Sequence, residues 1–314
     1  MLINEKEELF YEKYRPQRIQ DLILPEAMKT KLQSKLDSQN LPNLGLFSNS
    51  PGTGKTSTAK AIITEFLAKY GGESLFINAS LDNGIDTLRS EIQKFACQSS
   101  FDSKIKIVVL DEGDKFSEKG QAAFRGFIEE FSSNCRFIFT GNYKENIIPA
   151  LLDRLECYDY NELPKNEMIV PIFERLKFIL DNEKIEYNPN DLIPVINTFY
   201  PSIRSMVKTL QQCSSTGKFI LNEKELDQVN SYNSLINNIL ENNFKGIISE
   251  ANLINNPSSF YKMMYSKVLE INHPKINNPL IIISLAKYQH MDLSVRDKNL
   301  NLCACCVEIS NLLK

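Results

Sequence analysis

A short glycine-rich loop carries the clearest chemistry in the sequence. It lies between an apolar stretch and a helical one and reads Ser50-Pro51-Gly52-Thr53-Gly54-Lys55-Thr56-Ser57. Glycines let main-chain N–H groups approach phosphate oxygens, and the start of a helix favours a bound anion. Lys55 would reach the β- and γ-phosphates, and the hydroxyl of Thr56 would ligate Mg²⁺. The loop therefore predicts a nucleoside triphosphate site.

The first position of this loop departs from the usual pattern, because Asn49 replaces a glycine there. Asparagine tolerates a positive φ better than most residues, so the turn remains feasible. The alternative is an ordinary glycine-rich turn that binds no ligand. The expected strand before the loop and the expected helix after it, together with Lys55 and Thr56, favour phosphate binding.

Two carboxylates follow an apolar run further along the chain. Residues 107–110 read Ile-Val-Val-Leu and lead directly into Asp111 and Glu112. Beside a phosphate loop, Asp111 would hold the metal through water and Glu112 would polarise the attacking water. The alternative is a solvated acidic pair at the end of a strand. The intact loop favours the catalytic interpretation.

A third polar position ends another apolar stretch, in Thr140-Gly141-Asn142. A side chain at the tip of the strand next to the acidic one could reach the γ-phosphate and the attacking water, and Asn142 is the candidate. The alternative is an asparagine that serves turn geometry alone.

These residues need a parallel sheet to bring them together. We expect strands at 44–47, 74–78, 105–110, 136–140 and 157–160, with helices between them at 55–69, 86–97 and 121–131. This alternation predicts an α/β domain whose five-stranded parallel sheet is covered by helices on both faces. After Pro164 the pattern turns helical, with helix starts near Lys165, Asn190 and Ser202. We therefore predict a nucleotide-binding domain at 1–163, a small helical domain at 164–228 and a second helical domain at 229–314.

Composition limits the classes of protein that remain. The 314 residues are 42% hydrophobic and 24% charged, which predicts folded domains. A net charge of −3 excludes a uniformly basic nucleic-acid binder but leaves room for a local basic surface. The apolar runs are too short for a membrane helix, and the N-terminus lacks the apolar core of a signal peptide.

The chain has seven cysteines, and an odd number in a large chain favours reduced thiols in the cytoplasm. Cys303, Cys305 and Cys306 are interpreted as small apolar residues on a helix face rather than as a zinc site.

Several motifs together resemble those of AAA+ ATPases, and more closely those of the ATPase subunits of DNA sliding-clamp loaders. Besides the loop, the acidic pair and Thr140-Gly141-Asn142, they are Glu12-Lys13-Tyr14-Arg15-Pro16, Gln121-Ala122-Ala123-Phe124-Arg125, Asp153-Arg154-Leu155 and Tyr200-Pro201-Ser202-Ile203-Arg204. Within that family the sequence most resembles the large subunit of the clamp loader of T-even-type bacteriophages. The resemblance implies a AAA+ P-loop domain, a helical lid and an all-helical C-terminal collar that serves oligomerisation.

The resemblance also implies roles for residues outside the loop. Tyr14, Arg15 and Pro16 would contact the adenine end of the nucleotide. Arg154 would act as a catalytic arginine in the next subunit's site, although the family's Ser-Arg-Cys reads Asp153-Arg154-Leu155 here and Asp153 could pair with the arginine. Arg204 would reach the phosphates of its own site. For both arginines the alternative is an ordinary surface side chain.

Contacts to macromolecules come from the same resemblance. The implied DNA contacts are Gly84, Ile85, Arg89, Lys115, Lys119 and Gln121, with Gln121 also relaying DNA contact to Glu112. The implied clamp contacts are Phe95 and Phe101. For the DNA contacts the alternative is a solvated helix face. For the two phenylalanines the alternative is a place in the core. Gly113 stands where the family has a larger residue, which would loosen this turn.

The resulting hypothesis is an ATP- and Mg²⁺-dependent clamp-loader subunit. Its partners would be the sliding clamp, a different small subunit, further copies of itself and primer–template DNA, in the cytoplasm of a host cell if the protein is phage-encoded. One alternative is a structural subunit that binds nucleotide without turnover. Another is a different AAA+ machine, such as a helicase loader or a branch-migration motor. The complete set of loop and acidic residues favours an active ATPase.

Overall fold

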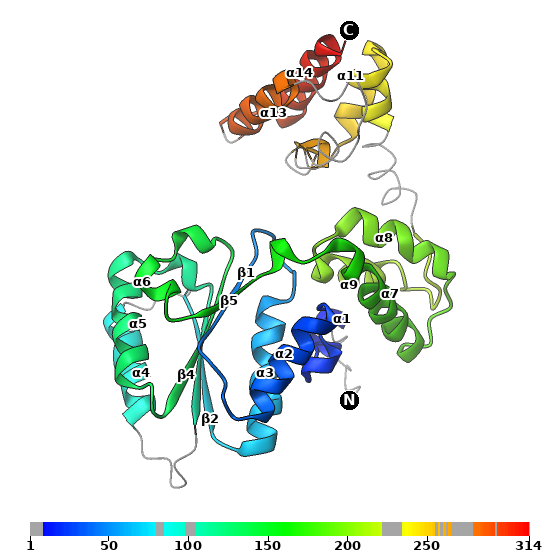
Figure 1. Ribbon diagram of the computed structural model, residues 1–314. Coiled ribbons are helices and arrows are strands. Elements are labelled where there is room, and N and C mark those ends of the chain that lie inside the picture. Colours follow the sequence, from blue (N-terminus) through cyan, green and yellow to red (C-terminus); the bar gives the residue numbers. More distant parts are fainter. Residues whose placement is uncertain are drawn as a thin grey trace, which may run out of the picture. The chain divides into compact units, whose positions relative to one another are not determined.

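The computed structural model describes residues 9–79, 85–97, 105–221, 234–254, 257, 260–261, 263–265, 279–292 and 294–313, with side chains of the 85–97 helix from Ser90 onward. The chain folds into two compact units, Met1–Ile220 and Leu221–Lys314 (Figure 1). Each unit is described by itself below.

A five-stranded parallel sheet forms the centre of the first unit. Its strands are β1 (Leu44–Phe47), β2 (Glu73–Asn78), β3 (Lys106–Asp111), β4 (Cys135–Gly141) and β5 (Glu156–Asp159). They pair in the order β2-β3-β4-β1-β5, and every neighbouring pair is parallel. The predicted α/β sheet is confirmed. The carboxyl ends of β1, β3 and β4 therefore lie side by side, and the loop, the acidic pair and Asn142 follow these ends.

Helices cover both faces of this sheet (Figure 1). α2 (Glu26–Asp37) and α3 (Lys55–Tyr70) lie on one face, and α4 (Ile85–Cys97), α5 (Glu118–Glu130) and the short α6 (Pro149–Leu152) lie on the other. Successive side chains of a strand point to opposite faces. Ile107 and Val109 accordingly join the core on the α3 side, whereas Val108 and Leu110 join the core on the α5 side. The sheet is thus buried on both faces, as its continuous apolar strands predict.

A helical region follows β5 within the same unit. It contains α7 (Lys165–Asn182), α8 (Leu192–Phe199) and α9 (Ile203–Gln212), in agreement with the three predicted helix starts. We call this region the lid. The short N-terminal helix α1 (Phe10–Lys13) contacts α9. The sheet and the lid belong to one compact unit that ends at Ile220, and the domain limits at 163 and 228 stay predictions.

The second unit is helical in its described part, with α11 (Phe244–Leu253), α13 (Pro279–Met291) and α14 (Lys298–Leu312) as its longest helices. Cys305 and Cys306 of α14 are buried in its core, and Cys303 packs against that core. The described residues hold no cluster of histidine, cysteine or acidic side chains suited to a metal ion. The places of the three cysteines in and against this core agree with their interpretation as apolar residues of a helix.

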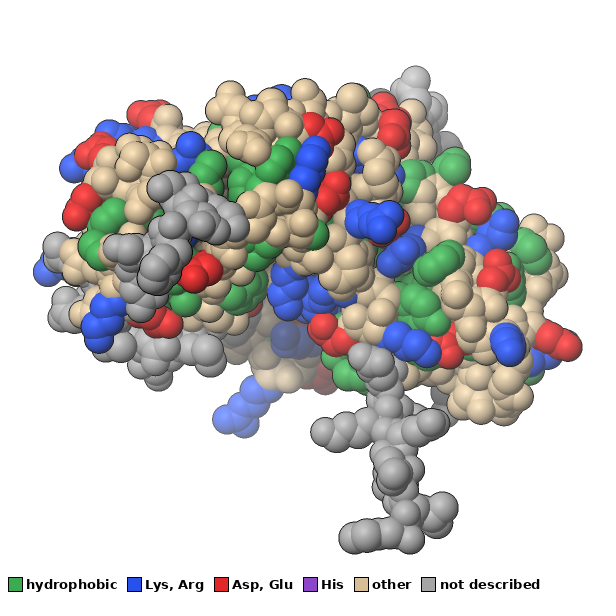
Figure 2. Space-filling model, turned by 90° about the horizontal axis from the view of Figure 1, so that it is seen from below, with side chains coloured by type: hydrophobic (Ala, Val, Ile, Leu, Met, Phe, Trp, Pro, Cys, Tyr) green, Lys and Arg blue, Asp and Glu red, His purple; other side chains and the backbone are tan. Residues whose placement is uncertain are grey.

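Charges of both signs are mixed on one face of the molecule. On the face seen from below, Lys and Arg side chains are interspersed with Asp and Glu and with apolar side chains (Figure 2). This fits the small net charge of the sequence. Among the helices that the structure describes, none combines the length and the apolar character needed to cross a membrane.

Candidate nucleotide-binding and hydrolysis site

The glycine-rich loop connects the end of β1 to the start of α3, as predicted. Gly52 and Gly54 have φ angles of 77° and 103°, a conformation that residues with a Cβ rarely adopt. A Cβ on Gly52 would also lie 2.6 Å from the hydroxyl oxygen of Ser202. Both glycines are therefore required by the shape of the loop.

The ammonium group of Lys55 is held inside the curve of this loop. It donates hydrogen bonds to the carbonyl oxygens of Ser48 (3.2 Å) and Ser50 (3.1 Å) and to Oδ1 of Asn142 (3.0 Å). Burial lowers the pKa of Lys55 to about 8, against the opposing charges of Asp114 and Asp111. The amine is thus positioned before any ligand arrives, and phosphate oxygens could replace its present acceptors.

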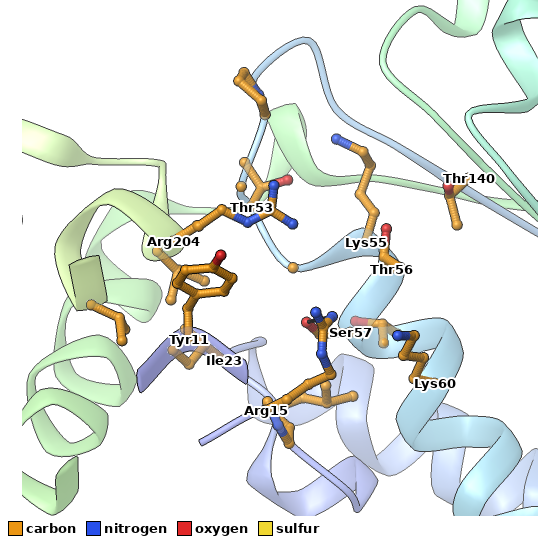
Figure 3. A pocket seen from close by; sticks show the side chains of 18 of the residues that line it. Tyr11, Arg15, Ile23, Thr53, Lys55, Thr56, Ser57, Lys60, Thr140 and Arg204 are labelled. Carbon is orange, nitrogen blue, oxygen red and sulfur yellow. Dashed lines mark hydrogen bonds between the residues drawn. The ribbon is translucent and has the colours of Figure 1, made fainter. Parts of the chain in front are cut away.

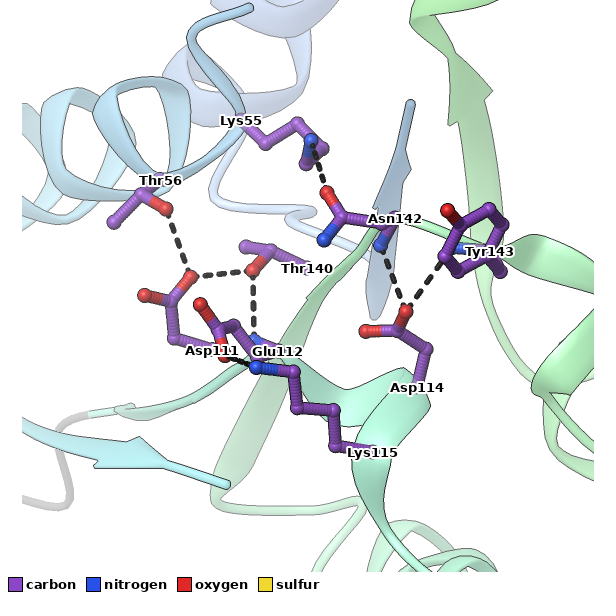
Figure 4. Close-up of polar contacts among 9 residues, drawn as sticks. All are labelled: Lys55, Thr56, Asp111, Glu112, Asp114, Lys115, Thr140, Asn142 and Tyr143. Atoms are coloured by element: carbon purple, nitrogen blue, oxygen red, sulfur yellow. Dashed lines mark hydrogen bonds and ion pairs between the residues drawn. The ribbon is translucent and has the colours of Figure 1, made fainter. Parts of the chain in front are cut away.

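Thr56 and Asp111 supply oxygen ligands at one point. The Thr56 hydroxyl lies 2.8 Å from Oδ1 of Asp111, to which it donates a hydrogen bond, and the Thr140 hydroxyl donates to the same oxygen (Figure 4). A hydroxyl beside a carboxylate is a donor set that Mg²⁺ prefers. Thr56 and Asp111 therefore fit the predicted metal site, in which the hydroxyl would be a direct ligand and the carboxylate would act through water.

Glu112 is held in an unusual main-chain conformation. Its φ of 58° lies in the left-handed region, which is uncommon for a residue other than glycine. The Glu112 N–H donates to the Thr140 hydroxyl (3.2 Å), and the carboxylate forms an ion pair with Lys115. Strained conformations of this kind persist where the surroundings determine them, often at functional sites. Lys115, expected as a DNA contact, thus lies beside the candidate catalytic carboxylate.

These groups line a cavity of about 330 Å³ (Figure 3). One end is polar and is formed by the loop, the acidic pair and Asn142. The other end carries apolar and aromatic side chains, namely Phe10, Tyr11, Tyr14, Pro16, Leu22, Ile23, Ile179, Ile203 and Val207. A mostly apolar pocket with a few convergent polar groups is typical of a small-molecule site. The polar end suits phosphates and the apolar end suits a base.

The predicted nucleotide contacts of the N-terminal segment, Tyr14, Arg15 and Pro16, all line this cavity. Arg15 donates to the Ser57 hydroxyl (3.2 Å) and pairs with Glu12. Tyr14 is bound to the lid, because its hydroxyl donates to Glu183 of the α7 C-cap (2.6 Å) and its carbonyl accepts from Arg175 (2.5 Å). Sequence reasoning missed Tyr11, Ile23 and Arg175, which come from segments with no phosphate-binding motif.

Arg204 lies where the lid meets the loop. Its N–H donates to the carbonyl of Gly52 (3.2 Å), and its guanidinium carbon lies 5.9 Å from the centre of the Tyr11 ring. The side chain also lines the cavity (Figure 3). The structure thus brings Arg204 to the predicted site, although its role toward phosphates stays a prediction.

Arg154 lies apart from the cavity of its own chain. Its Nε donates to Oε1 of Glu129 on α5 (2.8 Å), and its Nη1 donates to the carbonyl of Ala150 (2.6 Å). The acidic partner is therefore Glu129 and not the adjacent Asp153. A catalytic arginine that acts on another subunit is expected to lie outside its own site, so the position is compatible with that role.

Gln121 requires a correction. We expected it to contact DNA and to relay that contact to Glu112, but its side chain is 1% exposed. The amide donates to the carbonyls of Phe116 (3.0 Å) and Asn146 (2.8 Å) and accepts from the N–H of Ile148 (2.8 Å). These bonds make Gln121 a structural tie between α5 and the segment that precedes α6. Its buried side chain is not available to DNA.

The remaining macromolecular contacts are only partly described. Gly84, Phe101 and the side chain of Arg89 lie outside the described residues, and Ile85 begins α4. Lys119 is exposed at the start of α5, where a partner could reach it. The ring of Phe95 packs against the core and against the ammonium of Lys106 (5.0 Å), so it is a half-buried side chain rather than an exposed anchor.

Comparisons with known proteins identify the family of the chain. The family model "ATPase family associated with various cellular activities (AAA)" matches residues 45–162. Replication factor C small subunit 2 of Pyrobaculum arsenaticum is 32% identical over 250 residues, which cover 78% of this chain and 76% of that protein. The sliding-clamp-loader large subunit of Escherichia phage RB69 is 34% identical over 244 residues, covering 76% and 74%.

One further relative and one solved structure were also compared with the chain. Replication factor C subunit 3 of Saccharomyces cerevisiae is 36% identical over 207 residues, and the match covers 65% of this chain but only 59% of the yeast protein. A solved RuvB variant of Thermotoga maritima superposes with a TM-score of 0.53 at 13% identity, covering 68% of this chain and 70% of that one, which supports the fold alone. The archaeal and phage relatives show that the chain belongs to the clamp-loader family of AAA+ ATPases.

Proposed function

We propose that this protein is the ATP-hydrolysing subunit of a replication clamp loader. In this role it opens a ring-shaped sliding clamp, places it on primer–template DNA and releases it when ATP is hydrolysed. The observation that carries the proposal is the convergence of Lys55, Thr56, Asp111, Glu112 and Asn142 on one cavity. A subunit that only binds nucleotide could use Asp111 for the metal but would have no need for Glu112.

Each part of the cavity has a task in hydrolysis. The N-terminal segment and the apolar wall bind the base, and the loop amides and Lys55 bind the phosphates. Mg²⁺, held by Thr56 and through water by Asp111, would neutralise charge on the phosphates. Glu112 orients and polarises the attacking water, and Asn142 and Arg204 fix the γ-phosphate. Because the chemistry is mainly positioning and charge stabilisation, the pre-formed hydrogen bonds of Lys55 favour turnover.

Assembly with other subunits completes the proposed site. Arg154, which lies outside its own cavity, would complete the site of the next copy. The second unit exposes large apolar side chains on α13 and α14, including Leu280 (50% exposed), Ile283 (62%) and Leu300 (67%). Exposed apolar side chains in such numbers suit a subunit interface. They support the second unit as the oligomerisation collar for further copies and for a different small subunit.

DNA binding by the assembled complex would depend on phosphate contacts. Lys119 and the residues around the start of α4 are the remaining candidates, with Lys115 if it leaves Glu112. Binding should require ATP and should weaken steeply with salt, because released counterions dominate the affinity for DNA. An affinity unaffected by salt would contradict contacts along the DNA backbone.

The finer assignment is to the bacteriophage type of clamp loader, acting in the cytoplasm of a bacterial host. The relative from phage RB69 supports it, since the match covers three quarters of both chains. The archaeal relative has a similar identity and coverage, so these values alone do not favour the phage type. The proposal also uses the resemblance of the N-terminal motif, Glu12-Lys13-Tyr14-Arg15-Pro16, to the phage subunits.

The deciding experiment is the steady-state ATPase rate of the wild type and of Lys55→Ala, with the cognate small subunit, in the presence and absence of clamp and primed DNA. Strong stimulation by clamp plus primed DNA, lost in Lys55→Ala, is the expected result. A rate indifferent to both would indicate another AAA+ machine. ATP binding without turnover would indicate a structural subunit.

A further inference from the structure

One lysine of the cavity has no role so far. Lys60 belongs to α3 and lines the cavity together with Arg15, Thr56 and Ser57. It is the fourth residue after Thr56 and the third after Ser57, so the three side chains share one face of the helix. In the close-up of the cavity, Lys60 lies next to Ser57 (Figure 3). Lys60 therefore follows, by one helical turn, the residues that would meet the metal and the phosphates.

The charge of Lys60 lies where a helix alone would not favour it. Side chains of a helix lean toward its N-terminus, so the ammonium of Lys60 is directed back toward the first turn of α3. That turn carries the positive end of the helix dipole, where a cation is unfavourable and an anion is stabilised. A bound phosphate would remove this conflict, because it would supply an anion between the ammonium and the helix terminus.

The surroundings of Lys60 give it a support but no ion-pair partner. Its ammonium lies 5.4 Å from the centre of the Phe76 ring on the edge strand β2. Among the side chains that the structure describes, no carboxylate forms a salt bridge with it. Phe76 lines the same cavity and is 42% exposed. An exposed ring on an edge strand is accounted for if it holds this ammonium at the cavity wall by a cation–π contact.

Lys60 also lies near the N-terminal segment. Hydrogen bonds from Arg15 lower the pKa of the Glu12 carboxylate. The charges of Lys60 and Arg204 lower this pKa further, so both cations lie close to the segment. Arg15 in turn donates to the Ser57 hydroxyl (3.2 Å). The cavity is thus lined by three cations, Arg15, Lys60 and Arg204, that lie between the phosphate loop and the base end.

We propose that Lys60 binds the α-phosphate of the nucleotide, with Phe76 holding its ammonium in place. Lys55 and the metal ligands serve the β- and γ-phosphates, so the α-phosphate is the anionic group that remains between them and the base. Lys60 and Arg15 approach this position from α3 and from the N-terminal segment. The inference rests on the proposed binding of ATP in this cavity. It deepens that function by adding a cation that no motif of the sequence contains.

The test measures the Kd of ATP and of ADP by calorimetry for the wild type and for Lys60→Met in the whole chain. Methionine keeps the helix preference of the residue but removes its charge. Both nucleotides carry the α-phosphate. We therefore expect both Kd values to rise by about 5- to 20-fold, the effect of a lost charge-assisted hydrogen bond reduced by solvent screening. A loss confined to ATP would place Lys60 at the γ-phosphate and overturn the proposal, as would no loss for either nucleotide.

The matched control is Lys69→Met on the same helix. Lys69 lies in the last turn of α3, forms an ion pair with Asp37 at 2.9 Å and is not among the described residues that line the cavity. This variant loses the same charge and should keep both Kd values within about 1.5-fold of the wild type, because distant exposed charges are screened. An equal rise in Lys69→Met and Lys60→Met would show that net charge or helix stability explains the effect and would overturn the proposal.

Phe76→Leu tests how Lys60 is held. Leucine is apolar but offers no ring, so the Kd of ATP should rise about 2- to 5-fold while Lys60 is present. In the Lys60→Met background the same substitution should change Kd by less than about 1.5-fold, because the contact is already absent. An equal rise in both backgrounds would overturn the assignment of Phe76 as the support of Lys60.

The kinetics of the chain assembled with its small subunit give a second readout. A contact with the α-phosphate is made equally in the ground state and in the transition state. Lys60→Met should therefore raise KM for ATP about 5- to 20-fold and lower kcat less than about threefold. A large fall in kcat at unchanged KM would overturn the proposal. If the wild type binds both nucleotides but hydrolyses no ATP, the proposed ATPase function fails, and the Kd comparison still decides the role of Lys60.

Discussion

The phenol of Tyr14 donates a 2.6 Å hydrogen bond to the carboxylate of Glu183. Tyr14 lines the base end of the cavity, and Glu183 is the C-cap of α7 in the lid. Lys13 donates to the same carboxylate at 2.6 Å. The wall that would contact the base is therefore tied to the lid, and lid position and base binding are coupled through Glu183.

Loss of this tie should weaken ATP binding. Glu183→Ala removes a carboxylate that accepts charge-assisted hydrogen bonds, each of which contributes about 1.5–3 kcal/mol. Because only part of this free energy affects ATP binding, we expect calorimetry to give about a 3- to 10-fold higher Kd for ATP. Glu174→Gln is the control on the same helix, because Glu174 makes an exposed ion pair with Lys177 at 3.6 Å. Equal effects of the two variants would contradict the coupling.

The lowered pKa of Lys55 predicts a pH-dependent affinity. With a pKa of about 8, about half of the Lys55 side chains in the free protein are neutral at pH 8. Bound phosphates favour the charged form of Lys55, so binding of ATP above pH 8 takes up a proton. The association constant for ATP should therefore fall by up to about tenfold for each pH unit above 8. Affinity for ATP measured between about pH 7 and pH 9 should show this decline in the wild type and a flat profile in Lys55→Met. A flat wild-type profile would mean that Lys55 stays fully charged.

Arg154 should act on the neighbouring subunit. Arg154→Ala should lower stimulated ATP hydrolysis by about 10³-fold or more, because it removes charge stabilisation of the transferring phosphoryl group, and should leave ATP binding within a few-fold. Glu129→Gln, which frees the arginine from its ion pair, should retain most of the turnover. Collapse of ATP binding in Arg154→Ala would contradict the role in trans.

A mixing experiment distinguishes action in trans from action in cis. Lys55→Ala subunits retain Arg154, and Arg154→Ala subunits retain an intact loop, so a mixture of the two contains sites in which every required residue is present. Assembled mixtures should therefore recover part of the hydrolysis that each variant lacks alone. No recovery would place Arg154 in its own chain's site.

The contact between Thr56 and Asp111 predicts a specific defect in metal use. Thr56→Val should raise the Mg²⁺ concentration required for half-maximal hydrolysis by at least about tenfold, because a direct oxygen ligand is lost. ATP affinity in EDTA should stay near that of the wild type. Thr58→Val is the control on the same helix: Thr58 is a buried acceptor for Tyr160 at 2.7 Å, and its loss affects stability rather than metal use. Identical Mg²⁺ titrations of wild type and Thr56→Val would exclude Thr56 as a ligand.

Strands were predicted closely because their apolar runs are long and unbroken. The run at 105–110 became β3 at Lys106–Asp111, and the run at 136–140 became β4 at Cys135–Gly141. Helix starts were harder where no apolar residue marks the first turn. α5 begins at Glu118 rather than at Gln121, since Ser117 caps it. The same shift puts Gln121 in the helix interior, where its side chain is buried.

The contacts that hold the site residues could not be predicted from the sequence, because the partners lie on strands whose order in the sheet is not visible in the sequence. Asp114 holds the turn after β4 from the turn after β3, and these two strands are neighbours in space but separated in sequence by α5. Arg154 pairs with Glu129, which no local pattern connects to it, whereas the adjacent Asp153 was the natural guess from sequence. Motifs therefore revealed the groups that face the ligand, and only the fold revealed the groups that hold them.

The place of β1 in the sheet has a consequence for biosynthesis. β1 carries the phosphate loop, yet its partners are β4 and β5, which the ribosome produces roughly a hundred residues later. A nascent chain that ends before Cys135 has the complete loop sequence and no neighbouring strand to support it. Pairing between distant segments is also the slow step of folding. Nucleotide can therefore assist folding only after nearly the whole sheet has emerged from the ribosome. A protease should accordingly cut ribosome-bound chains that end before β5 to the same extent with and without ATP.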